Sequence, residues 1–287
     1  MKYAWIKKYQ DEYDITLMCE VIGVGRTSYY DWLKSQPSPR DLEDQKLAMQ
    51  IKEIFMNSRN TYGTRRIRKM LMRLDITISR KRISRLMKKH DLCCKTKRKF
   101  KITTDSNHPY PISPNILERD FSATAPDQKY VGDITYIWTL EGWLYLAVVI
   151  DVFSRKAVGW SIKSHMRASL VNDALLMALS TRNIKPGLIS HTDRGSQYAS
   201  NDHRKILKLH KIIQSMSRKG DCWDNSVAES FFHTLKTELV HHVIFKTREE
   251  AKQAIFEYIE VFYNRQRMHS ANDYFSPEEY EQRVVNL

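Results

Sequence analysis

The stretch between residues 129 and 163 constrains the fold most, because three strand-forming segments follow one another almost without interruption. Lys129–Thr139 and Trp143–Val152 are rich in Val, Ile, Tyr and Trp, Glu141–Gly142 between them suits a tight turn, and Lys156–Ile162 forms a third strand. Helix-like and strand-like segments then alternate along Ala168–Thr181, Leu188–His191, Asp202–His210, Ile212–Met216 and Ser226–Val240. This order predicts an α/β domain in which helices flank a mixed sheet.

The positive charge of the chain is concentrated in one segment. The 287 residues contain 47 Lys and Arg against 33 Asp and Glu, a net charge of +14. Between Arg59 and Lys101 there are 17 basic residues and only 2 acidic ones, so the rest of the chain is close to neutral. Such a segment predicts a polyanionic partner, because each Lys or Arg that contacts a phosphate releases a counterion. The alternative is a solvated helix face that binds nothing in particular.

Several classes of protein are excluded. The longest apolar run, Leu144–Ile150, is far shorter than the ~20 residues of a membrane-spanning helix. The first 14 residues lack the apolar segment of a secretory signal. The four cysteines show neither the paired spacing nor the histidine partners of a zinc site. We therefore expect a cytoplasmic protein with reduced thiols and no membrane association.

Two helix-turn-helix patterns precede the strand-rich region. In the stronger one, a helix face is formed by Ile67, Met70, Leu71 and Leu74. After a break at residues 75–77, Ser79 is the expected N-cap of a second helix, whose apolar positions are Ile83, Leu86 and Met87. The weaker pattern is a helix over residues 15–22, a turn at residues 23–25 and a second helix from Thr27.

The second helix of the stronger pattern is the expected DNA-reading element. Its outer face carries Arg80, Lys81, Arg82, Arg85, Lys88 and Lys89. A short helix with apolar residues inward and basic residues outward can enter the major groove while its partner crosses the backbone. We therefore predict that these six side chains bind DNA.

The change in composition along the chain predicts five regions. Half of the prolines lie between Lys101 and Gln128, which marks an extended linker. We expect an N-terminal helix-turn-helix at 1–36, a basic helix-turn-helix domain at 43–101, the linker at 102–126, the α/β domain at 127–240 and a helical extension at 241–287. In the extension, Arg248–Tyr263 is amphipathic, and a capping box at Ser276–Glu279 opens a terminal helix.

Three acidic residues fall where the predicted sheet would bring them together. Asp133 lies inside the first strand, Asp193 follows the strand Leu188–His191, and Glu229 lies in the first turn of the helix that starts at Ser226. Each also has a structural interpretation. Asp133 could pair with a basic neighbour, Asp193 could cap a turn with Gly195, and Glu229 could complete a capping box with Ser226.

Carboxylates from three elements at one sheet edge repel each other unless a cation neutralises them. Hard oxygen ligands of this kind select Mg²⁺ or Mn²⁺. Two such ions ~3.5–4 Å apart would stabilise the attacking and the leaving oxygens of an in-line phosphoryl displacement. We therefore predict a two-ion site with Asp133, Asp193 and Glu229 as ligands.

The spacing of these acids, with 35 residues between the last two, resembles the D,D-35-E signature of the retroviral-integrase superfamily. More narrowly, the chain resembles the second-frame (OrfB) transposases of two-frame insertion sequences. The matching stretches occur in order over nearly the whole chain, at Tyr62–Ile67, Asp133–Tyr136, Asp151–Arg155, His191–Tyr198, Trp223–Ser226, Glu229–Phe232, Tyr263–Asn264 and Ser276–Pro277.

The resemblance implies a fold, an activity and a set of partners. The fold is a ribonuclease-H-like integrase catalytic core at 127–240, preceded by an all-α helix-turn-helix region in place of the zinc-binding module of retroviral integrases. The activity is metal-dependent cleavage at transposon ends followed by strand transfer, with Asp133, Asp193 and Glu229 as the acidic ligands. The partners are transposon-end and target DNA, further copies of the chain on DNA, and the upstream-frame product as fusion or partner, in a bacterial, nucleoid-associated setting.

Residues near the acids have two interpretations each. Lys236 lies near the Glu229 face of its helix, where it would contact a DNA phosphate or simply occupy the surface. Trp223 would stack on a base or pack in the interior. With a turn at Glu141–Gly142, Asp133 lies opposite Ile150, which places Asp151 on the other sheet face and excludes it as a fourth ligand.

Two other functions are compatible with the sequence. The chain would be a non-catalytic DNA-binding regulator that occupies transposon ends, or a structure-selective ribonuclease-H-like nuclease that cuts without joining. A strand-transfer assay with pre-cut ends and magnesium distinguishes all three.

Overall fold

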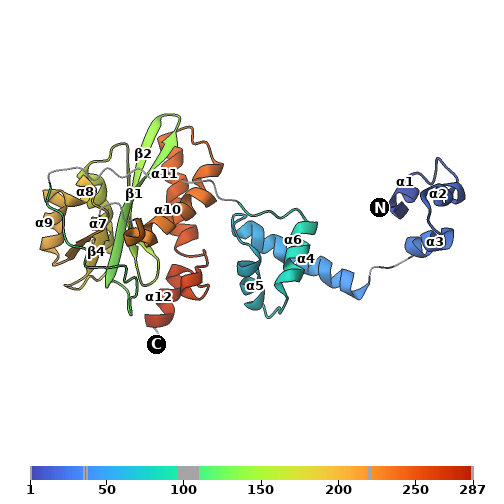
Figure 1. The fold of residues 1–287 in the computed structure, drawn as a ribbon, viewed down its shortest axis with the longest axis horizontal. Coiled ribbons are helices and arrows are strands. Elements are labelled where there is room, and N and C mark those ends of the chain that lie inside the picture. The colour runs from blue at the N-terminus through green and yellow to red at the C-terminus, as the bar shows by residue number, and fades with distance from the viewer. Residues whose placement is uncertain (1, 35, 37, 96–109, 219–221, 286–287) are drawn as a thin grey trace.

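The computed structural model describes residues 2–34, 36, 38–95, 110–218 and 222–285, and every structural statement below refers to them. The elements form three groups in chain order, which are three N-terminal helices, three further helices and an α/β core (Figure 1). The first part of the expected linker, residues 102–109, lies outside this description, as do Lys219 and Gly220 in the loop before Trp223.

The first group is the weaker of the two expected helix-turn-helix units. It contains α1 (Lys2–Lys8), α2 (Ile15–Ile22) and α3 (Arg26–Lys34) around a small core of Ile6, Met18, Cys19 and Tyr29. Gly23 ends α2 in the left-handed region, at φ 67°, as a C-capping glycine does. The two predicted helices are confirmed. The short α1 was not predicted, because seven residues show no clear period.

The second group carries the basic segment. It consists of α4 (Pro39–Asn57), α5 (Thr64–Met72) and α6 (Arg80–Lys89). As predicted, Oγ of Ser79 caps α6 by accepting a hydrogen bond from the Arg82 N–H at 3.2 Å. The prediction that Leu74 belongs to the inner face of the first helix was wrong, because α5 ends at Met72 and Leu74 is exposed. Sequence analysis also missed α4, which supplies Leu47, Ile51, Ile54 and Phe55 to the common core.

The core domain is built on a five-stranded mixed sheet, as predicted. Its strands are β1 (Lys129–Thr139), β2 (Gly142–Asp151), β3 (Ala157–Lys163), β4 (Ile189–Thr192) and β5 (Ile213–Met216), in the order β3-β2-β1-β4-β5. The first three strands are antiparallel, whereas β4 and β5 run parallel to β1.

The register of the first hairpin differs from the prediction by two residues. Thr139 pairs with Gly142, so the turn is formed by residues 140 and 141, and Asp133 lies opposite Val148 instead of Ile150. Gly142 takes φ 103° at the first position of β2, and the Thr139 hydroxyl donates a hydrogen bond to its carbonyl. A two-residue shift leaves each side chain on its predicted face, so the placement of Asp151 opposite to Asp133 still holds.

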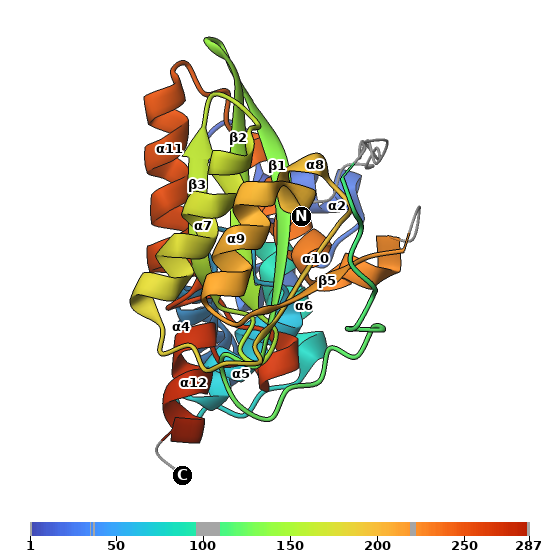
Figure 2. The same cartoon turned by 90° about the vertical axis from the view of Figure 1, so that its left-hand side faces the viewer.

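Helices cover both faces of the sheet (Figures 1 and 2). One face carries α7 (Ala168–Thr181), the single-turn α8 (Ser196–Ala199) and α9 (Asn201–Leu209). The other carries α10 (Ser226–Glu238) and α11 (Arg248–Phe256), which continues as a π-helical segment, η3 (Glu257–Tyr263). The C-terminal helices therefore belong to the same apolar core as the sheet. The chain ends with α12 (Pro277–Val285), opened by the predicted capping box between Ser276 and Glu279.

Among the described residues, no helix combines the length and the apolar composition needed to cross a bilayer.

We predict that Gly159→Ala destabilises the core domain severely. A Cβ at this position of β3 would lie 2.1 Å from the backbone oxygen of Ala174 and 2.8 Å from the backbone nitrogen of Ala178, so α7 would have to move off the sheet. Overpacking of this kind costs about 3 kcal/mol or more. Urea unfolding followed by circular dichroism measures the loss. Gly63→Ala, whose Cβ would meet only the Cys94 sulfur at 3.8 Å, is the matched control. Equal stability of the two variants would contradict the close approach of α7.

Burial of His203 predicts a pH dependence of stability. Its Nδ1 lies 2.9 Å from the Asn172 Oδ1, and burial lowers the pKa of His203 from 6.5 to about 4. Between these pH values the unfolded chain binds more protons, so the free energy of unfolding falls as the pH falls. His203→Gln should reduce this slope by up to about 1.4 kcal/mol per pH unit. Denaturant titrations at pH 4.5 to 7 measure it, and identical slopes in both proteins would refute the assignment.

Candidate active site and DNA-binding surface

Two of the three predicted acids are brought together by the parallel pairing of β1 with β4. The last paired residues are Gly132 and Thr192, and Asp133 and Asp193 each follow by one residue. The Asp133 carboxylate accepts a hydrogen bond from the Ile134 N–H at 2.8 Å, and that of Asp193 accepts one from the Gly195 N–H at 2.9 Å. Asp193 therefore caps a turn with Gly195, as its structural interpretation predicted. This role does not separate it from Asp133, whose pKa it raises.

The third acid projects from the first turn of α10. The N-cap of this helix is Asn225 instead of Ser226, and the Asn225 side chain forms no capping hydrogen bond. The capping box proposed as the structural interpretation of Glu229 is therefore not formed. Glu229 is exposed, and its carboxylate does not cap the start of α10.

The acids interact electrostatically. Burial and the neighbouring carboxylates of Asp193 and Glu229 raise the pKa of Asp133 well above its usual value, against the Ile134 amide and the charge of Lys236. Burial also raises the pKa of Glu229. Asp133 thus lies where extra positive charge would be favourable.

The donor set suits a hard divalent cation, although the site is not a finished metal cage. Three side chains offer carboxylate oxygens, the ligands that Mg²⁺ and Mn²⁺ prefer. Within the described part of the chain, no three His, Cys, Asp or Glu side chains form a ready-made metal cluster. The aspartate pair is fixed by the sheet, whereas Glu229 lies on a separate element.

Lys236 faces the acids from two turns further along α10. Burial lowers its pKa, whereas the charge of Asp133 raises it, which places the two side chains in one electrostatic environment. Its Nζ also lies 5.2 Å from the centre of the Tyr136 ring, a cation–π distance. Lys236 is thus part of the site instead of an ordinary surface residue.

Sequence analysis missed the residue that fixes the start of α10. Asp224 is fully buried, and its carboxylate accepts hydrogen bonds from Arg119 Nε at 2.8 Å, Asn115 Nδ2 at 2.9 Å, and the Arg218 backbone and side chain. The adjacent Asn225 donates to the Gly132 carbonyl at 3.1 Å, next to Asp133. The motif Trp223–Asn225 was noticed for its resemblance alone, because a sequence does not show which of many aspartates is buried.

The structure decides between the two interpretations of Trp223 and agrees with the predicted face of Asp151. Trp223 is 68% exposed, so it is not an interior tryptophan. Asp151 is fully buried on the other sheet face from Asp133, and its carboxylate accepts hydrogen bonds from the N–H groups of Asp127 and Phe153 at 2.9 and 2.8 Å. Burial raises the pKa of Asp151 to about 7. It organises the end of β2 and is not a ligand of the acid cluster.

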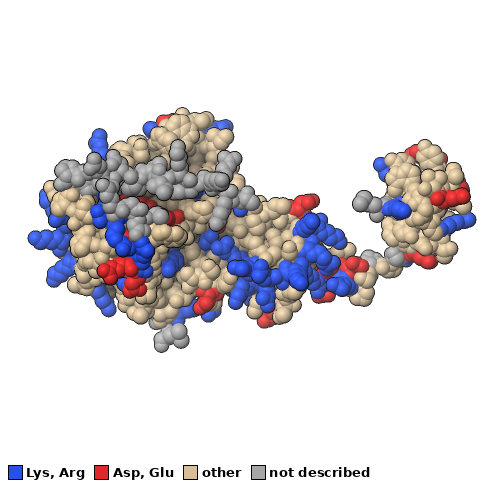
Figure 3. Space-filling view, in the orientation of Figure 1, with Lys and Arg blue, Asp and Glu red and all other residues tan. Residues whose placement is uncertain are grey.

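The basic residues of α6 divide into two sets. Arg82 donates to the Asp44 carboxylate at 2.8 Å and pairs with Glu43 at 2.9 Å, and Arg85 pairs with the other oxygen of Asp44. The other predicted contacts, Arg80, Lys81, Lys88 and Lys89, are exposed. Figure 3 shows Lys and Arg crowded over the α4–α6 region. This surface carries the charge that a DNA-binding helix needs.

Comparison with known proteins agrees with this architecture. Models of the integrase core domain match residues 123–222 and 229–285, and a model of an HTH-like domain matches residues 42–100. The chain is 47% identical over 260 residues, 91% of this chain and 96% of the relative, to the insertion element IS600 uncharacterized 31 kDa protein of Shigella sonnei. It is 43% identical over 283 residues, 98% of both chains, to transposase InsF for insertion sequence IS3A of Escherichia coli strain K12. The magnesium complex of the HTLV-2 integrase catalytic core domain, in its trimeric form, is 17% identical and aligns with a TM-score of 0.43 over 56% of this chain and 99% of that one.

The fold and the comparisons together define an integrase-type polynucleotidyl transferase with a helix-turn-helix DNA-binding region. Catalytic cores of this type are metal-dependent. Within that class, the chain belongs to the IS3 family of insertion-sequence transposases, of which it is an OrfB-type, DDE-superfamily member. The regulator and nuclease alternatives are not favoured.

We predict that Asp224→Asn loosens the start of α10. The substitution removes the charge that holds Arg119 and Arg218, and loss of a buried, paired carboxylate costs about 2 kcal/mol or more. Urea unfolding measures this loss. Asp202→Asn, an exposed change on α9, is the control and should stay within about 0.5 kcal/mol of the parent. If both variants are equally stable, Asp224 does not hold α10 in place.

Proposed function

We propose that Asp133, Asp193 and Glu229 are the acidic residues at which this transposase cuts transposon ends and joins them to target DNA. The observation that carries the proposal is the parallel register of β1 and β4, which sets Asp133 beside Asp193 at the sheet edge. The raised pKa of Asp133 supports it, because a carboxylate held among other carboxylates is stabilised by a bound cation.

The carboxylates would hold two Mg²⁺ or Mn²⁺ ions, which supply charge stabilisation to the attacking and leaving oxygens of phosphoryl transfer. The protein contributes position and electrostatics. Asp133 and Asp193 are held by the sheet, the Asn225 side chain ties α10 to β1, and Lys236 would orient a DNA phosphate beside Asp133. Water is the nucleophile for cleavage and a DNA 3′-hydroxyl for joining, so no side chain becomes covalently linked to DNA.

The remaining partners follow the same proposal. The exposed basic face of α6 would position transposon-end DNA through Arg80, Lys81, Lys88 and Lys89, with smaller contributions from the ion-paired Arg82 and Arg85. We retain the functional division into 1–36, 43–101, 102–126, 127–240 and 241–287. We also propose that several copies assemble on DNA at the bacterial nucleoid, and that the upstream-frame product joins them as fusion or partner.

Asp133→Asn should abolish both chemical steps while DNA binding is retained. The variant keeps the size of the side chain but loses the charge that would bind the cation, so strand transfer of pre-cut ends with Mg²⁺ should fall by about 1000-fold or more. A duplex titration followed by fluorescence anisotropy should change by less than about twofold. Mg²⁺ should raise the melting temperature of the parent protein and not that of the variant.

The control is Asp202→Asn, which removes an equivalent charge from an exposed position of α9. It should leave cleavage, joining and the Mg²⁺ effect unchanged. Strand transfer retained by Asp133→Asn would refute the assignment. Cleavage without joining in the parent protein would indicate a nuclease, and metal-independent binding without either step would indicate a regulator.

A further inference from the structure

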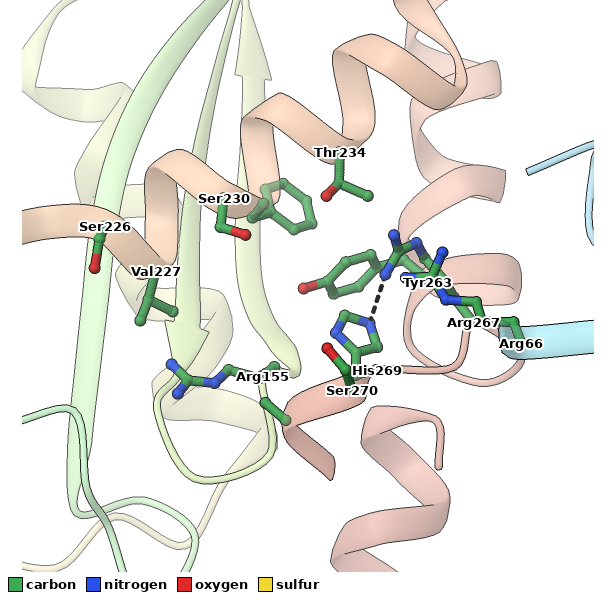
Figure 4. A pocket seen from close by; sticks show the side chains of 12 residues that line it. Arg66, Arg155, Ser226, Val227, Ser230, Thr234, Tyr263, Arg267, His269 and Ser270 are labelled. Atoms are coloured by element: carbon green, nitrogen blue, oxygen red, sulfur yellow. Dashed lines mark hydrogen bonds between the residues drawn. The ribbon is translucent and has the colours of Figure 1, made fainter. Parts of the chain in front are cut away.

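A cavity of about 320 Å³ lies beside α10 (Figure 4), and none of the three acids lines it. The helix contributes Ser226, Ser230 and Thr234 to its wall. The other walls come from distant parts of the chain, with Arg66 from α5, Arg155 from the turn between β2 and β3, and the segment after η3. The cavity is therefore a junction between the helix-turn-helix domain and the catalytic core.

The walls of this cavity carry more positive charge than the surrounding protein neutralises. Of its three arginines, Arg267 is paired with the buried Glu238, at 2.7 Å between Nη2 and Oε1 and 2.9 Å between Nε and Oε2. Within the described residues, Arg66 and Arg155 form no ion pair with an acidic side chain. One guanidinium nitrogen of Arg155, Nη1, is buried without a hydrogen-bond partner.

The surroundings of these two arginines show that the charge is unfavourable when the cavity holds no anion. Burial lowers the pKa of Arg66 and that of Arg155. Burial and the charges of Arg267, Arg66 and Arg155 lower the pKa of the adjacent His269 well below its usual value, so this ring is neutral and adds no charge. Half-buried guanidinium groups without an acidic partner cost free energy that a bound anion would recover.

We propose that this cavity is a phosphate-binding site, in which Arg66 and Arg155 contact phosphate groups from its two ends (Figure 4). Guanidinium groups match phosphate oxygens with paired donors, and the hydroxyls of Ser226, Ser230 and Thr234 offer further ones. The source that the position favours is the backbone of bound DNA, because the cavity lies between the basic helices and the helix that carries Glu229. A free phosphate would satisfy the same donors.

The proposal rests on the proposed function only in taking DNA as the partner, and it does not depend on the three acids. Because Arg66 and Arg155 come from two domains, a DNA backbone with phosphates at the two ends of the cavity would join the helix-turn-helix domain to the core. The bound strand itself would then help to fix the domains relative to one another.

The first arm of the test measures counterion release in the full chain. Affinity for duplex DNA is measured by fluorescence anisotropy at several salt concentrations for the parent, Arg66→Gln, Arg155→Gln and the double variant. One lost phosphate contact lowers the slope of log K against log salt by about 0.9. Each single variant should lose about this amount and bind roughly tenfold more weakly, and the double variant should lose about twice as much slope. Arg204→Gln, an exposed arginine on α9, is the control and should keep the parental slope.

The second arm separates the two sources of phosphate. Melting temperatures are measured in inorganic phosphate and in chloride at equal ionic strength. Stabilisation by phosphate that is lost in the double variant, with an unchanged DNA slope, assigns the site to a free phosphate. A loss of DNA slope assigns it to the DNA backbone. A double variant that matches the parent in both arms overturns the proposal.

Two further proteins keep the result interpretable. The double lysine variant, Arg66→Lys with Arg155→Lys, retains both charges and replaces the double glutamine variant if the latter does not fold. The lysine variant should bind DNA more weakly than the parent while keeping most of the salt slope. Asp133→Asn should keep the full slope and the full phosphate effect. Failure of the phosphate site therefore leaves the catalytic proposal standing, and failure of the catalytic proposal leaves the phosphate site standing.

Discussion

The parallel pairing of β1 with β4 is the constraint on which the rest of the site depends. It forces two carboxylates to adjacent positions at the end of a short ladder, where backbone register leaves neither the freedom to move away. Like charges held in this way cost folding free energy. The remaining features of the site either reduce that cost, as Lys236 does, or add to it, as Glu229 does. A bound cation would offset this cost by neutralising the neighbouring carboxylates.

The α10 helix connects the acid cluster to the rest of the molecule through contacts at both of its ends. Its start is tied to β1 through Asn225 and to the preceding loop through Asp224. At its other end, the buried Glu238 binds Arg267 and Tyr258, and its backbone carbonyl accepts a hydrogen bond from Lys95 at 2.9 Å. Because Lys95 belongs to the helix-turn-helix domain, just after α6, a single helix connects the acid cluster with the DNA-binding region.

Sequence periodicity was sufficient for the core domain and insufficient for the contacts between elements. The strands and helices from residue 129 onward were predicted nearly in full, because each buries a regular face. The α4 helix was missed, since its apolar and charged residues lie too evenly around the axis to show one stripe. The hairpin turn was misplaced by one residue, and the pairing register therefore by two, because Gly142 uses its positive φ within the strand instead of in the turn.

The candidate site was predictable in part for the same reason. Asp133, Asp193 and Glu229 could be found because an acid inside a strand, one just after a strand and one in a first helical turn are conspicuous against an apolar pattern. The role of Asp224 and the pairing of Arg82 with Asp44 could not, because each joins side chains far apart in the sequence. The same limit applies to Arg66 and Arg155, whose shared cavity depends on how two domains pack.

The arginines of α6 and those of the cavity differ in whether acidic side chains neutralise their charge. Arg82 and Arg85 on α6 face Glu43 and Asp44, so contact with DNA would replace existing ion pairs and gain little net free energy. Among the described residues, Arg66 and Arg155 form no ion pair with an acidic side chain, so a phosphate that reaches either of them displaces no carboxylate. A count of basic residues therefore overstates the importance of α6 for affinity. The position of uncompensated charge, at the junction beside the catalytic helix, is the better guide to where DNA is held most firmly.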